Sequence, residues 1–450
     1  MANPLAHAQG LRGARALLSI ADFRWLLSSN VLWWQAHFME AIVVGWLVLE
    51  MTNSPWLVAV AGFCRSLPLL ILGFVAGQVA DRFGRRRVIL AAQSTNFTVQ
   101  VTLVILLLTD SLQLWHLYAT GVILGACWAM DWPARRSLLP DLVGKERTVD
   151  AMLLENLSQG FSRIGGPAIA GVLVAAYGAI GAYLVMMLLS GATLTTLSYL
   201  SGQPIPKTNR RAAASPWSVL GESLRYVGKN QPILGVILIT AAFNMWVVPY
   251  MTLLPVIARD VLRVGPAGLG YLGAASGVGS FFGLLLIAQI RRHFSNGWIM
   301  LVGTIGMSIV LFGLSQSTWY PLSWGLLFMA GMGQACFGIM QTSIILLTAS
   351  DEMRSRTMGV LVLAIGSDPL GKLQTGALAQ VLGAATALSV MTGAAALALV
   401  GIGIALPGLR AMPAPATQQV PPLVPPIGPA AQTPTGVPQS THTPSQPGGN

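Results

Sequence analysis

Long apolar runs separated by short polar connections repeat along the chain. Helices buried in a soluble protein would show polar faces, and these runs show none. A helix that crosses a bilayer needs about 20 predominantly apolar residues. Runs of suitable length cover residues 28–49, 56–79, 88–108, 114–131, 149–176, 180–200, 232–257, 267–290, 298–315, 319–348, 357–381 and 386–406. The pattern predicts an all-α integral membrane protein with twelve transmembrane helices.

The composition argues against an ordinary soluble enzyme. Only 9% of the 450 residues are charged and 54% are hydrophobic, whereas about a quarter of the residues of a soluble domain are charged. Tryptophans such as Trp115 and Trp298 lie toward the ends of runs, where amphipathic rings favour the membrane interface. Cys64, Cys127 and Cys336 lie far apart in apolar runs, so we expect neither a disulfide framework nor a metal cluster.

The basic residues are distributed unequally between the two sides of the predicted bundle. One set of connections holds only Arg259 and Arg263, and Arg65, Arg163 and Lys372 lie inside runs. All other Lys and Arg residues lie in the N-terminal segment, in the alternate connections or after the last run. Because cytoplasmic loops retain Lys and Arg, both termini are predicted to be cytoplasmic. The net charge of +11 then reflects topology and attraction to anionic lipid, and we expect no nucleic-acid partner.

Composition also divides the chain into segments. Residues 201–231 are polar, basic and interrupted by prolines, which indicates a linker, and the uncharged, proline-rich chain after Arg410 predicts a disordered or polyproline-like tail. The first run is too long for the apolar part of a cleavable signal peptide. The predicted organisation is a cytoplasmic N-terminal segment (1–27), a six-helix bundle (28–200), a cytoplasmic linker (201–231), a second six-helix bundle (232–407) and a cytoplasmic tail (408–450).

The two predicted bundles show an internal repeat at an offset of 205 residues. The offset aligns four residues of the first half with the same residue types in the second: Gly166 with Gly371, Gly171 with Gly376, Gly178 with Gly383, and Met186 with Met391. It also places the fifth run on the eleventh, as duplication of a six-helix unit requires. Since duplicated transporters bind their substrate between the repeats, the expected fold is a pair of pseudo-symmetric six-helix bundles.

A short motif between the second and third runs combines glycines, an aspartate and arginines. Gly77 permits close helix packing, and Gly84 permits the left-handed backbone of a tight turn. Asp81 supplies a carboxylate that an arginine or a helix N-terminus can engage. A merely basic loop would explain the arginines but not the other three residues. The motif reads Gly77-Gln-Val-Ala-Asp81-Arg82-Phe-Gly84-Arg85-Arg86-Arg87.

This motif resembles the signature loop of the major facilitator superfamily, and the resemblance extends over nearly all of residues 20–407. Residues 45–55, 133–142, 254–260 and 351–356 resemble the branch that contains enterobactin exporters and macrolide-efflux proteins. The resemblance implies the major facilitator fold and a location in the bacterial cytoplasmic (inner) membrane. It also implies that Asp81 helps to latch the two halves against the eleventh span in the outward-open state, and that the first, fourth, seventh and tenth spans line the cavity.

A second motif, in the fifth run, is similar to the antiporter motif of exporters in the superfamily. It contains Gly166, Pro167 and Gly171, but Ala170 stands where that motif has glycine. This departure leaves uptake or facilitated diffusion open as alternatives to antiport. Apart from the resemblance, proline bends a helix and glycine lets a second helix approach, so tight packing alone is the alternative explanation of the motif.

Six ionisable residues lie well inside the runs. At about 3 kcal/mol for a charge at the centre of a lipid-facing helix, six would cost roughly 18 kcal/mol. That exceeds a typical net folding stability of about 5 to 15 kcal/mol, so these residues must pair, titrate or line a wet cavity. They are Glu40, Arg65, Glu155, Arg163, Asp368 and Lys372.

The buried charges nearest the first connection are the candidates for proton coupling. Glu40 and Arg65 lie at equal distances from that turn, so an antiparallel hairpin allows an ion pair, with Asp368 as an alternative partner for Arg65. Asp368 can also pair with Lys372, one helical turn away. We expect Glu40 to carry the coupling proton and His37, on the same face, to tune it. Asp368 is the second candidate, and a permanent Glu40–Arg65 pair that only orients helices is the alternative.

The other polar residues inside the runs are candidates for a gate or for substrate contacts. Asp131 and Arg135, at the end of the fourth run, are predicted to belong to the cytoplasmic gate, and Glu155 to a gate or a solvated position. Polar residues in membrane helices also hold helices together, so each substrate assignment has a packing alternative. The candidates are Asn30, Gln35, Trp128, Asn244, Tyr250, Gln334 and Gln341.

The sequence contains no Gly-x-x-x-x-Gly-Lys-Ser/Thr loop, metal-ligand cluster or nucleophile elbow. We therefore expect no cofactor, no metal and no enzymatic activity, with energy drawn from an ion gradient or from the substrate. The favoured hypothesis is a monomeric, proton-coupled exporter of a small amphipathic molecule, a siderophore or a drug, that works by alternating access. The alternatives are a facilitator or uptake transporter, and a membrane sensor or scaffold without transport.

Overall fold

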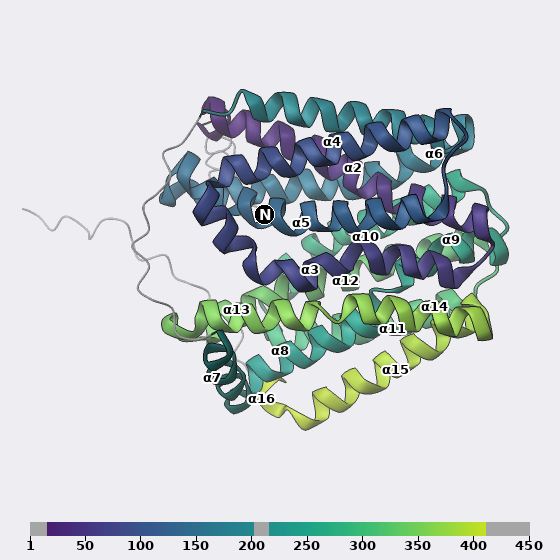
Figure 1. Cartoon of the computed structure of the whole chain (residues 1–450). Helices are drawn as coiled ribbons and strands as arrows, with labels where there is room; N and C mark the ends of the chain where they lie inside the picture. Colours follow the sequence, from purple (N-terminus) through teal and green to yellow (C-terminus); the bar gives the residue numbers. More distant parts are fainter. Residues whose placement is uncertain (1–15, 202–215, 411–450) are drawn as a thin grey trace, which may run out of the picture.

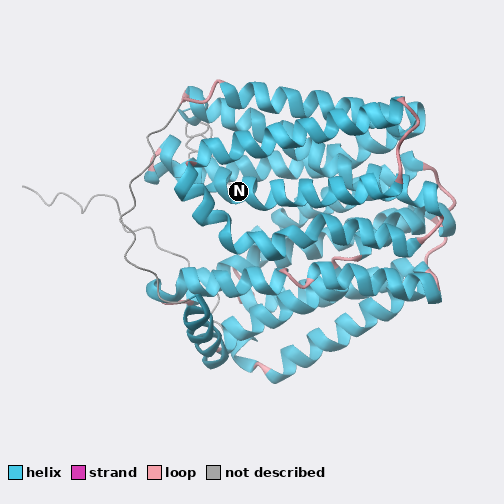
Figure 2. Cartoon of the chain, in the orientation of Figure 1, coloured by secondary structure: helices cyan, strands magenta, loops and turns pink. Residues whose placement is uncertain are grey.

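The described part of the protein is entirely helical. The computed structural model describes residues 16–201 and 216–410, apart from the side chains of residues 74–78, 81, 145, 149, 216–220, 351 and 355. Within these ranges every regular element is a helix, and most helices lie side by side along a common direction (Figure 1, Figure 2). The predicted all-α class is therefore confirmed.

The elements follow one another with short connections. The longer helices are α2 (Ala21–Thr52), α3 (Pro55–Phe83), α4 (Arg85–Leu108), α5 (Leu114–Val143), α6 (Thr148–Ser198), α10 (Pro266–Ile290), α11 (Asn296–Gln316), α12 (Tyr320–Thr348) and α15 (Ala384–Ala405). The shorter ones are η1 (Lys145–Arg147), α7 (Pro216–Lys229), α8 (Gln231–Ala242), η2 (Phe243–Val247), α9 (Tyr250–Val256), η3 (Ile257–Val261), α13 (Asp351–Ile365), α14 (Asp368–Leu382) and α16 (Pro407–Arg410). Helix α7 lies inside the segment predicted as a linker.

Nine stretches of the described chain are long and apolar enough to cross a membrane. One of them, Asp150–Ser198, contains 49 residues, which at about 1.5 Å per residue is roughly twice the thickness of a bilayer core. Its helix α6 is interrupted at Gly178, which has a φ of 68° and lies between the predicted fifth and sixth runs. Each predicted run falls mostly on helical residues, with turns inside the runs 232–257 and 357–381, and the count of twelve crossings stays a prediction.

Large apolar side chains are exposed on the outside of the bundle. Leu188 and Leu347 are 66% and 68% exposed, and Leu397 and Val381 are 78% and 81% exposed. In water such a surface would drive association, whereas in a bilayer it faces hydrocarbon. The exposed surface is that of an integral membrane protein.

Two pairs of helices join the first six predicted spans to the last six. Within the first set, α2 packs against α6, and α4 contacts α5 and α6; within the second, α12 packs against α10 and α11. Across the sets, the main contacts are α6 with α10 and α3 with α14; Figure 1 shows the purple α3 beside the green α14. The bundle boundaries stay a prediction, but these crossings place α3 and α14 side by side.

The glycine repeat has a structural counterpart. Gly178 and Gly383, which the offset of 205 aligns, adopt positive φ values of 68° and 82° and end their helical stretches. Gly171 lies against α10, where an added Cβ would stand 2.8 Å from Gly270 Cα, and Gly376 lies against α3, where an added Cβ would come still closer to Ala59 Cβ. Aligned glycines therefore make the two crossings between the helix sets.

Two of the spans are irregular near their middle. The stretch Gln231–Val261 passes from α8 through the π-helix η2 to α9 and the π-helix η3, and π-helical turns often accompany functional sites. The second irregular span breaks between α13 and α14, at Gly366 and Ser367. Asp368 consequently occupies the first turn of α14, where the helix dipole stabilises a carboxylate.

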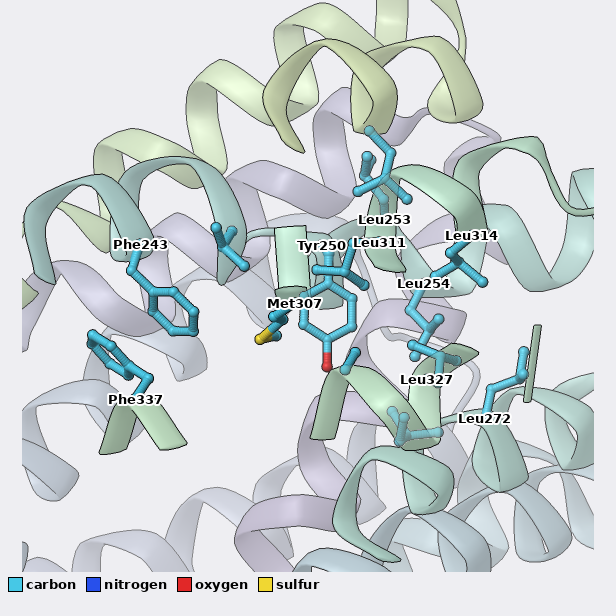
Figure 3. Close-up of a cluster of buried hydrophobic side chains, with 14 of the residues drawn as sticks. Phe243, Tyr250, Leu253, Leu254, Leu272, Met307, Leu311, Leu314, Leu327 and Phe337 are labelled. Carbon is cyan, nitrogen blue, oxygen red and sulfur yellow. The ribbon is translucent and has the colours of Figure 1, made fainter. Parts of the chain in front are cut away.

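The largest apolar core joins most of the helices. Figure 3 shows part of it, in which Phe243 faces Phe337 and Tyr250 lies among leucines of neighbouring helices. The Phe243 and Phe337 rings stack with centroids 3.9 Å apart. Tyr250, a candidate substrate contact, is only 2% exposed. In this conformation Tyr250 packs in the core.

Candidate functional site

A cavity of about 380 Å³ lies between α2, α3, α5, η2, α9 and α14. The volume is within the usual range for a small-molecule site. Most of the lining is apolar, and the titratable or charged side chains come from three helices. They are His37 and Glu40 from α2, Arg65 from α3, and Asp368 and Lys372 from α14. The structure therefore brings all four proton-coupling candidates, and one further buried charge, to a single cavity.

Arg65 connects two side chains of α2, Glu40 and His37. Its Nη2 atom lies 3.3 Å from Glu40 Oε2 and 3.1 Å from His37 Nδ1. Arginine can only donate hydrogen bonds, so His37 Nδ1 accepts, and the ring is neutral with its proton on Nε2. The expected Glu40–Arg65 pair is present, and the guanidinium links a carboxylate to an imidazole.

A second ion pair lies on α14. Lys372 Nζ is 2.7 Å from Asp368 Oδ2, as their spacing predicts, and Nζ also donates to Ser66 Oγ of α3 at 3.2 Å. The other carboxylate oxygen, Asp368 Oδ1, is buried and has no hydrogen-bond partner among the described residues. Asp368 therefore pairs with Lys372 here and leaves Arg65 to Glu40. The Lys372–Ser66 contact crosses the α3–α14 junction.

The Asp131–Arg135 pair is buried beside the cavity. Arg135 Nε lies 2.9 Å from Asp131 Oδ2, and Arg135 Nη1 donates to Ser29 Oγ at 2.8 Å and to Asn30 Oδ1 at 2.6 Å. The Arg135 guanidinium also lies 4.9 Å from the ring centre of Trp33. Asn30, a candidate substrate contact, is thus occupied in holding Arg135.

A small polar space adjoins the charged cavity on the side of Gln93, a partner of Asp131. Gln93 Nε2 donates to Asp131 at 2.6 Å, and a space of about 10 Å³ beyond it is lined by Gln93, Asn96 and Gln100 together with His37 and Glu40. Each of the three α4 side chains has a buried oxygen that accepts no hydrogen bond from the part of the chain that the structure describes. A space of this size and polarity suits one water molecule. These residues are not among the candidates predicted from the sequence, although the spacing 93, 96, 100 places them in one polar stripe of a helix.

Of the substrate candidates, Trp128 and Asn244 line the cavity. Trp128 stacks on His37 with ring centroids 5.8 Å apart. Gln341 donates to Thr240 Oγ1 at 2.9 Å and so joins α12 to α8. Gln35 and Gln334 each have a buried side-chain atom without a hydrogen-bond partner, and with Asn30, Tyr250 and Gln341 they lie outside the residues that line the cavity.

The remaining buried charges lie on α6. Glu155 is 3% exposed and its carboxylate lies 4.0 Å from Arg136, whose guanidinium stacks over Trp132 at 4.6 Å. Arg163 lies over the Phe38 ring at 5.6 Å, and among the described residues it has no carboxylate within ion-pair distance. Arg163 is thus a buried cation compensated by an aromatic face.

The arginine-rich turn ties α3 and α4 to their neighbours. Gly84 adopts a φ of 89°, as a tight reversal requires. Arg85 pairs with Asp141 of α5, and Arg86 donates to a backbone carbonyl of α6 at 3.1 Å. The side chain of Arg82 lies near Phe83, 5.5 Å from its ring centre. The arginines therefore bind elements of the same helix set.

The arginine-rich motif also contains a glycine and an aspartate at the end of α3. Gly77 and Asp81 lie in the last turns of α3, but the side chain of Asp81 lies outside the described residues. Its expected latching role against the eleventh span stays a prediction.

Contacts between the helix sets gather at the end of the bundle that carries Asn53. Arg259 Nη1 donates to the Leu49 carbonyl at 3.1 Å and to Asn53 Oδ1 at 2.8 Å. Ser54 Oγ donates to Gln380 Oε1 at 2.9 Å. These bonds join α2 to η3 and the start of α3 to α14. The cavity is therefore bridged at this end.

A helical membrane bundle with charged side chains in a central cavity defines a transporter of the major facilitator type. Residues 13–427 match the transmembrane secretion effector family. The chain belongs to that family, and the resemblance to the major facilitator superfamily is confirmed.

Relatives of known function are also transporters. The enterobactin exporter EntS of Salmonella typhimurium is 25% identical over 386 residues, which cover 83% of this chain and 89% of EntS. The staphyloferrin A transporter of Staphylococcus aureus is 25% identical over 65% of this chain and 72% of its own length. The multidrug efflux pump Tap of Mycolicibacterium fortuitum is 26% identical over 75% of this chain and 84% of its own length.

Solved structures share the fold. A bacterial homologue of the human lysosomal transporter Spinster matches with a TM-score of 0.64 at 14% identity, covering 86% of this chain and 96% of that protein. A POT family transporter in complex with 5-aminolevulinic acid matches with a TM-score of 0.69 at 13% identity, over 86% and 96%. At these identities the likeness establishes the fold alone.

Proposed function

We propose that this transporter exports a small amphipathic molecule in exchange for protons by alternating access. The names of the relatives favour a siderophore or a drug-like compound as substrate. The proposed location is the bacterial cytoplasmic membrane, with both termini in the cytoplasm. The observation that carries the proposal is the Glu40–Arg65–His37 cluster on the wall of the cavity.

The coupling follows from competition for one carboxylate. An ionised Glu40 accepts hydrogen bonds strongly and can bind a hydroxyl or ammonium group of the substrate. A proton on Glu40 removes the charge and most of that affinity, and also weakens the bond to Arg65. Because proton and substrate exclude one another from the same oxygen atoms, binding of one releases the other, which is the requirement for antiport.

The neighbouring groups prepare Glu40 for this exchange. Arg65 stabilises the ionised carboxylate, while its contact with His37 gives the guanidinium a second partner when Glu40 is protonated. The polar space beside Gln93 and Asn96 offers a water-sized step toward the Asp131 end of the passage. Arg65 and His37 are thus positioning residues for a proton on Glu40.

The test is the exchange of Glu40 for glutamine in liposomes. We expect Glu40→Gln to abolish proton flux driven by enterobactin, staphyloferrin A or a cationic dye, whichever the wild type transports, because glutamine cannot take up the proton. The measurement is the quenching of a pH-sensitive dye inside the vesicles. Glu50→Gln is the matched control, since Glu50 lies in the same helix but is exposed.

The alternatives give different results in the same experiment. The alanine at position 170 favours a facilitator, which would move substrate without moving protons in the wild type. A sensor or scaffold would move neither. Full proton coupling in Glu40→Gln would contradict the role given to this carboxylate.

A further inference from the structure

A second, larger cavity lies on the outer surface, away from the charged site. It has a volume of about 550 Å³ and lies between α10, α11 and α12. Its lining is almost wholly apolar and includes three glycines and three methionines. We call it the α10–α12 groove; its lining residues are Leu286, Ile290, Phe294, Trp298, Ile299, Val302, Gly303, Gly306, Met307, Val310, Met329, Met332, Gly333 and Cys336.

The groove opens outward toward the membrane. Val302 is 55% exposed, Met329 53% and Trp298 42%. Gly306 leaves space, because an added Cβ there would meet no atom within 4 Å. Flexible methionines adapt to chains of varied shape. In a bilayer these features suit a hydrocarbon chain lying along the helices.

One end of the groove is strongly basic. Arg291 and Arg292 lie directly between the lining residues Ile290 and Phe294, and both are exposed. Residues 261–350, which contain the whole groove, include no Asp or Glu. The two guanidinium groups therefore have no carboxylate on α10, α11 or α12 to neutralise them.

We propose that the α10–α12 groove binds an anionic phospholipid. An acyl chain occupies the apolar groove, and the phosphate lies against Arg291 and Arg292, in keeping with basic pockets between membrane helices that bind lipid head groups. Trp298, at the same end, is placed for the interface between head group and chain. A second copy of this chain is a poorer occupant, because a two-fold contact here would bring like charges together.

The site reaches the transport machinery through one helix. Leu286 and Ile290 of α10 line the groove, and Gly270 of the same helix packs against Gly171 of α6. A lipid in the groove therefore contacts a helix that joins the two helix sets. The proposal does not depend on the exported substrate or on proton coupling.

The groove can be tested with brominated lipids, which quench tryptophan fluorescence on contact. The full-length protein is placed in vesicles of equal parts phosphatidylglycerol and phosphatidylcholine, with the bromine on one lipid or on the other. The Trp298 signal is the difference from a Trp298→Phe variant. We expect phosphatidylglycerol to be preferred at Trp298 by about fivefold for each arginine, the usual effect of one basic residue near an anionic surface.

Two pairs of variants separate charge from shape. Arg291→Gln with Arg292→Gln should remove the preference, whereas Arg24→Gln with Arg147→Gln, an equal loss of charge at exposed positions elsewhere, should keep it. Gly306→Leu should fill the groove and reduce quenching by both lipids, and Gly401→Leu, also in open space, should not. Equal quenching by the two lipids in the wild type, a preference that survives the loss of Arg291 and Arg292, or no quenching at all would overturn the proposal.

Discussion

Two arginines show how the surroundings of a buried guanidinium decide its role. Arg135 is 1% exposed and held by Asp131, Ser29 and Asn30, so its charge is fixed in place. Arg65 faces the cavity and is held by one carboxylate and one imidazole. If Arg65 loses one of these partners, it keeps the other, and water in the cavity can reach its guanidinium group. Arg135 therefore stabilises the structure, whereas the surroundings of Arg65 allow the protonation of its partner Glu40 to change.

Removal of the Arg135 side chain should destabilise the protein. Arg135→Ala leaves the fully buried Asp131 without its cation, and breaking such a pair costs about 3 to 5 kcal/mol. We expect a large fall in the melting temperature of the purified protein in detergent. Arg24→Ala, which removes an exposed arginine, should leave the melting temperature nearly unchanged. Equal melting temperatures for the two variants would contradict a structural role for the pair.

The sequence predicted some pairings and missed others for a physical reason. Glu40 and Arg65 could be paired because equal distance from a turn fixes their depth, and Asp368 with Lys372 because both lie on one helix. The Lys372–Ser66 and Arg85–Asp141 contacts depend on how each helix is rotated, which depth alone does not determine.

At the scale of elements, glycine determines which helices cross closely. Gly171 and Gly376 remove side chains where α6 meets α10 and where α14 meets α3. Their alignment at one offset predicted equivalent roles, and the structure supplies them with equivalent neighbours. The sequence did not predict the breaks at Gly366 or in η2, because the apolar pattern continues through them.

A larger side chain at the α6–α10 crossing should destabilise the protein. An added Cβ at Gly171 would lie 2.5 Å from the Pro266 carbonyl oxygen, so Gly171→Val must push the helices apart. Overpacking of this kind costs about 1 to 3 kcal/mol, and we expect a lower melting temperature together with slower transport. Gly393→Val, at an open position of α15, is the control. A melting temperature for Gly171→Val that matches the control would show that the crossing tolerates separation.

At the scale of the whole molecule, side-chain hydrogen bonds link the two helix sets near Asn53. Hydrogen bonds from Arg259 and Ser54 cross between the sets there. Alternating access requires that such contacts break and form again while the cavity changes the side to which it opens. Under the proposed alternating access, the end near Asn53 separates during each cycle.

A reversible cross-link at the end near Asn53 should prevent that separation and stop transport. Ser54→Cys with Gln380→Cys, in a chain whose three native cysteines are replaced by serine, places two thiols where a hydrogen bond now lies. A short bis-methanethiosulfonate, which forms a disulfide with each cysteine and releases methanesulfinate, should reduce transport to background, and reduction of the two disulfides should restore it. Each single-cysteine variant should be unaffected by the reagent. Undiminished transport by the cross-linked protein would rule out opening at this end.

The glycine crossing of α6 and α10 has a mechanical consequence. Because backbone touches backbone there, no side chain has to change rotamer when one helix tilts against the other. From Gly171 to the start of α6 at Thr148 the helix extends about 35 Å at 1.5 Å per residue. A tilt of about 10° about this point moves the distant end by roughly 6 Å, more than one helical turn. If the helix sets rock as proposed, a small rotation at this crossing thus widens the path for a solute at the distant end of α6.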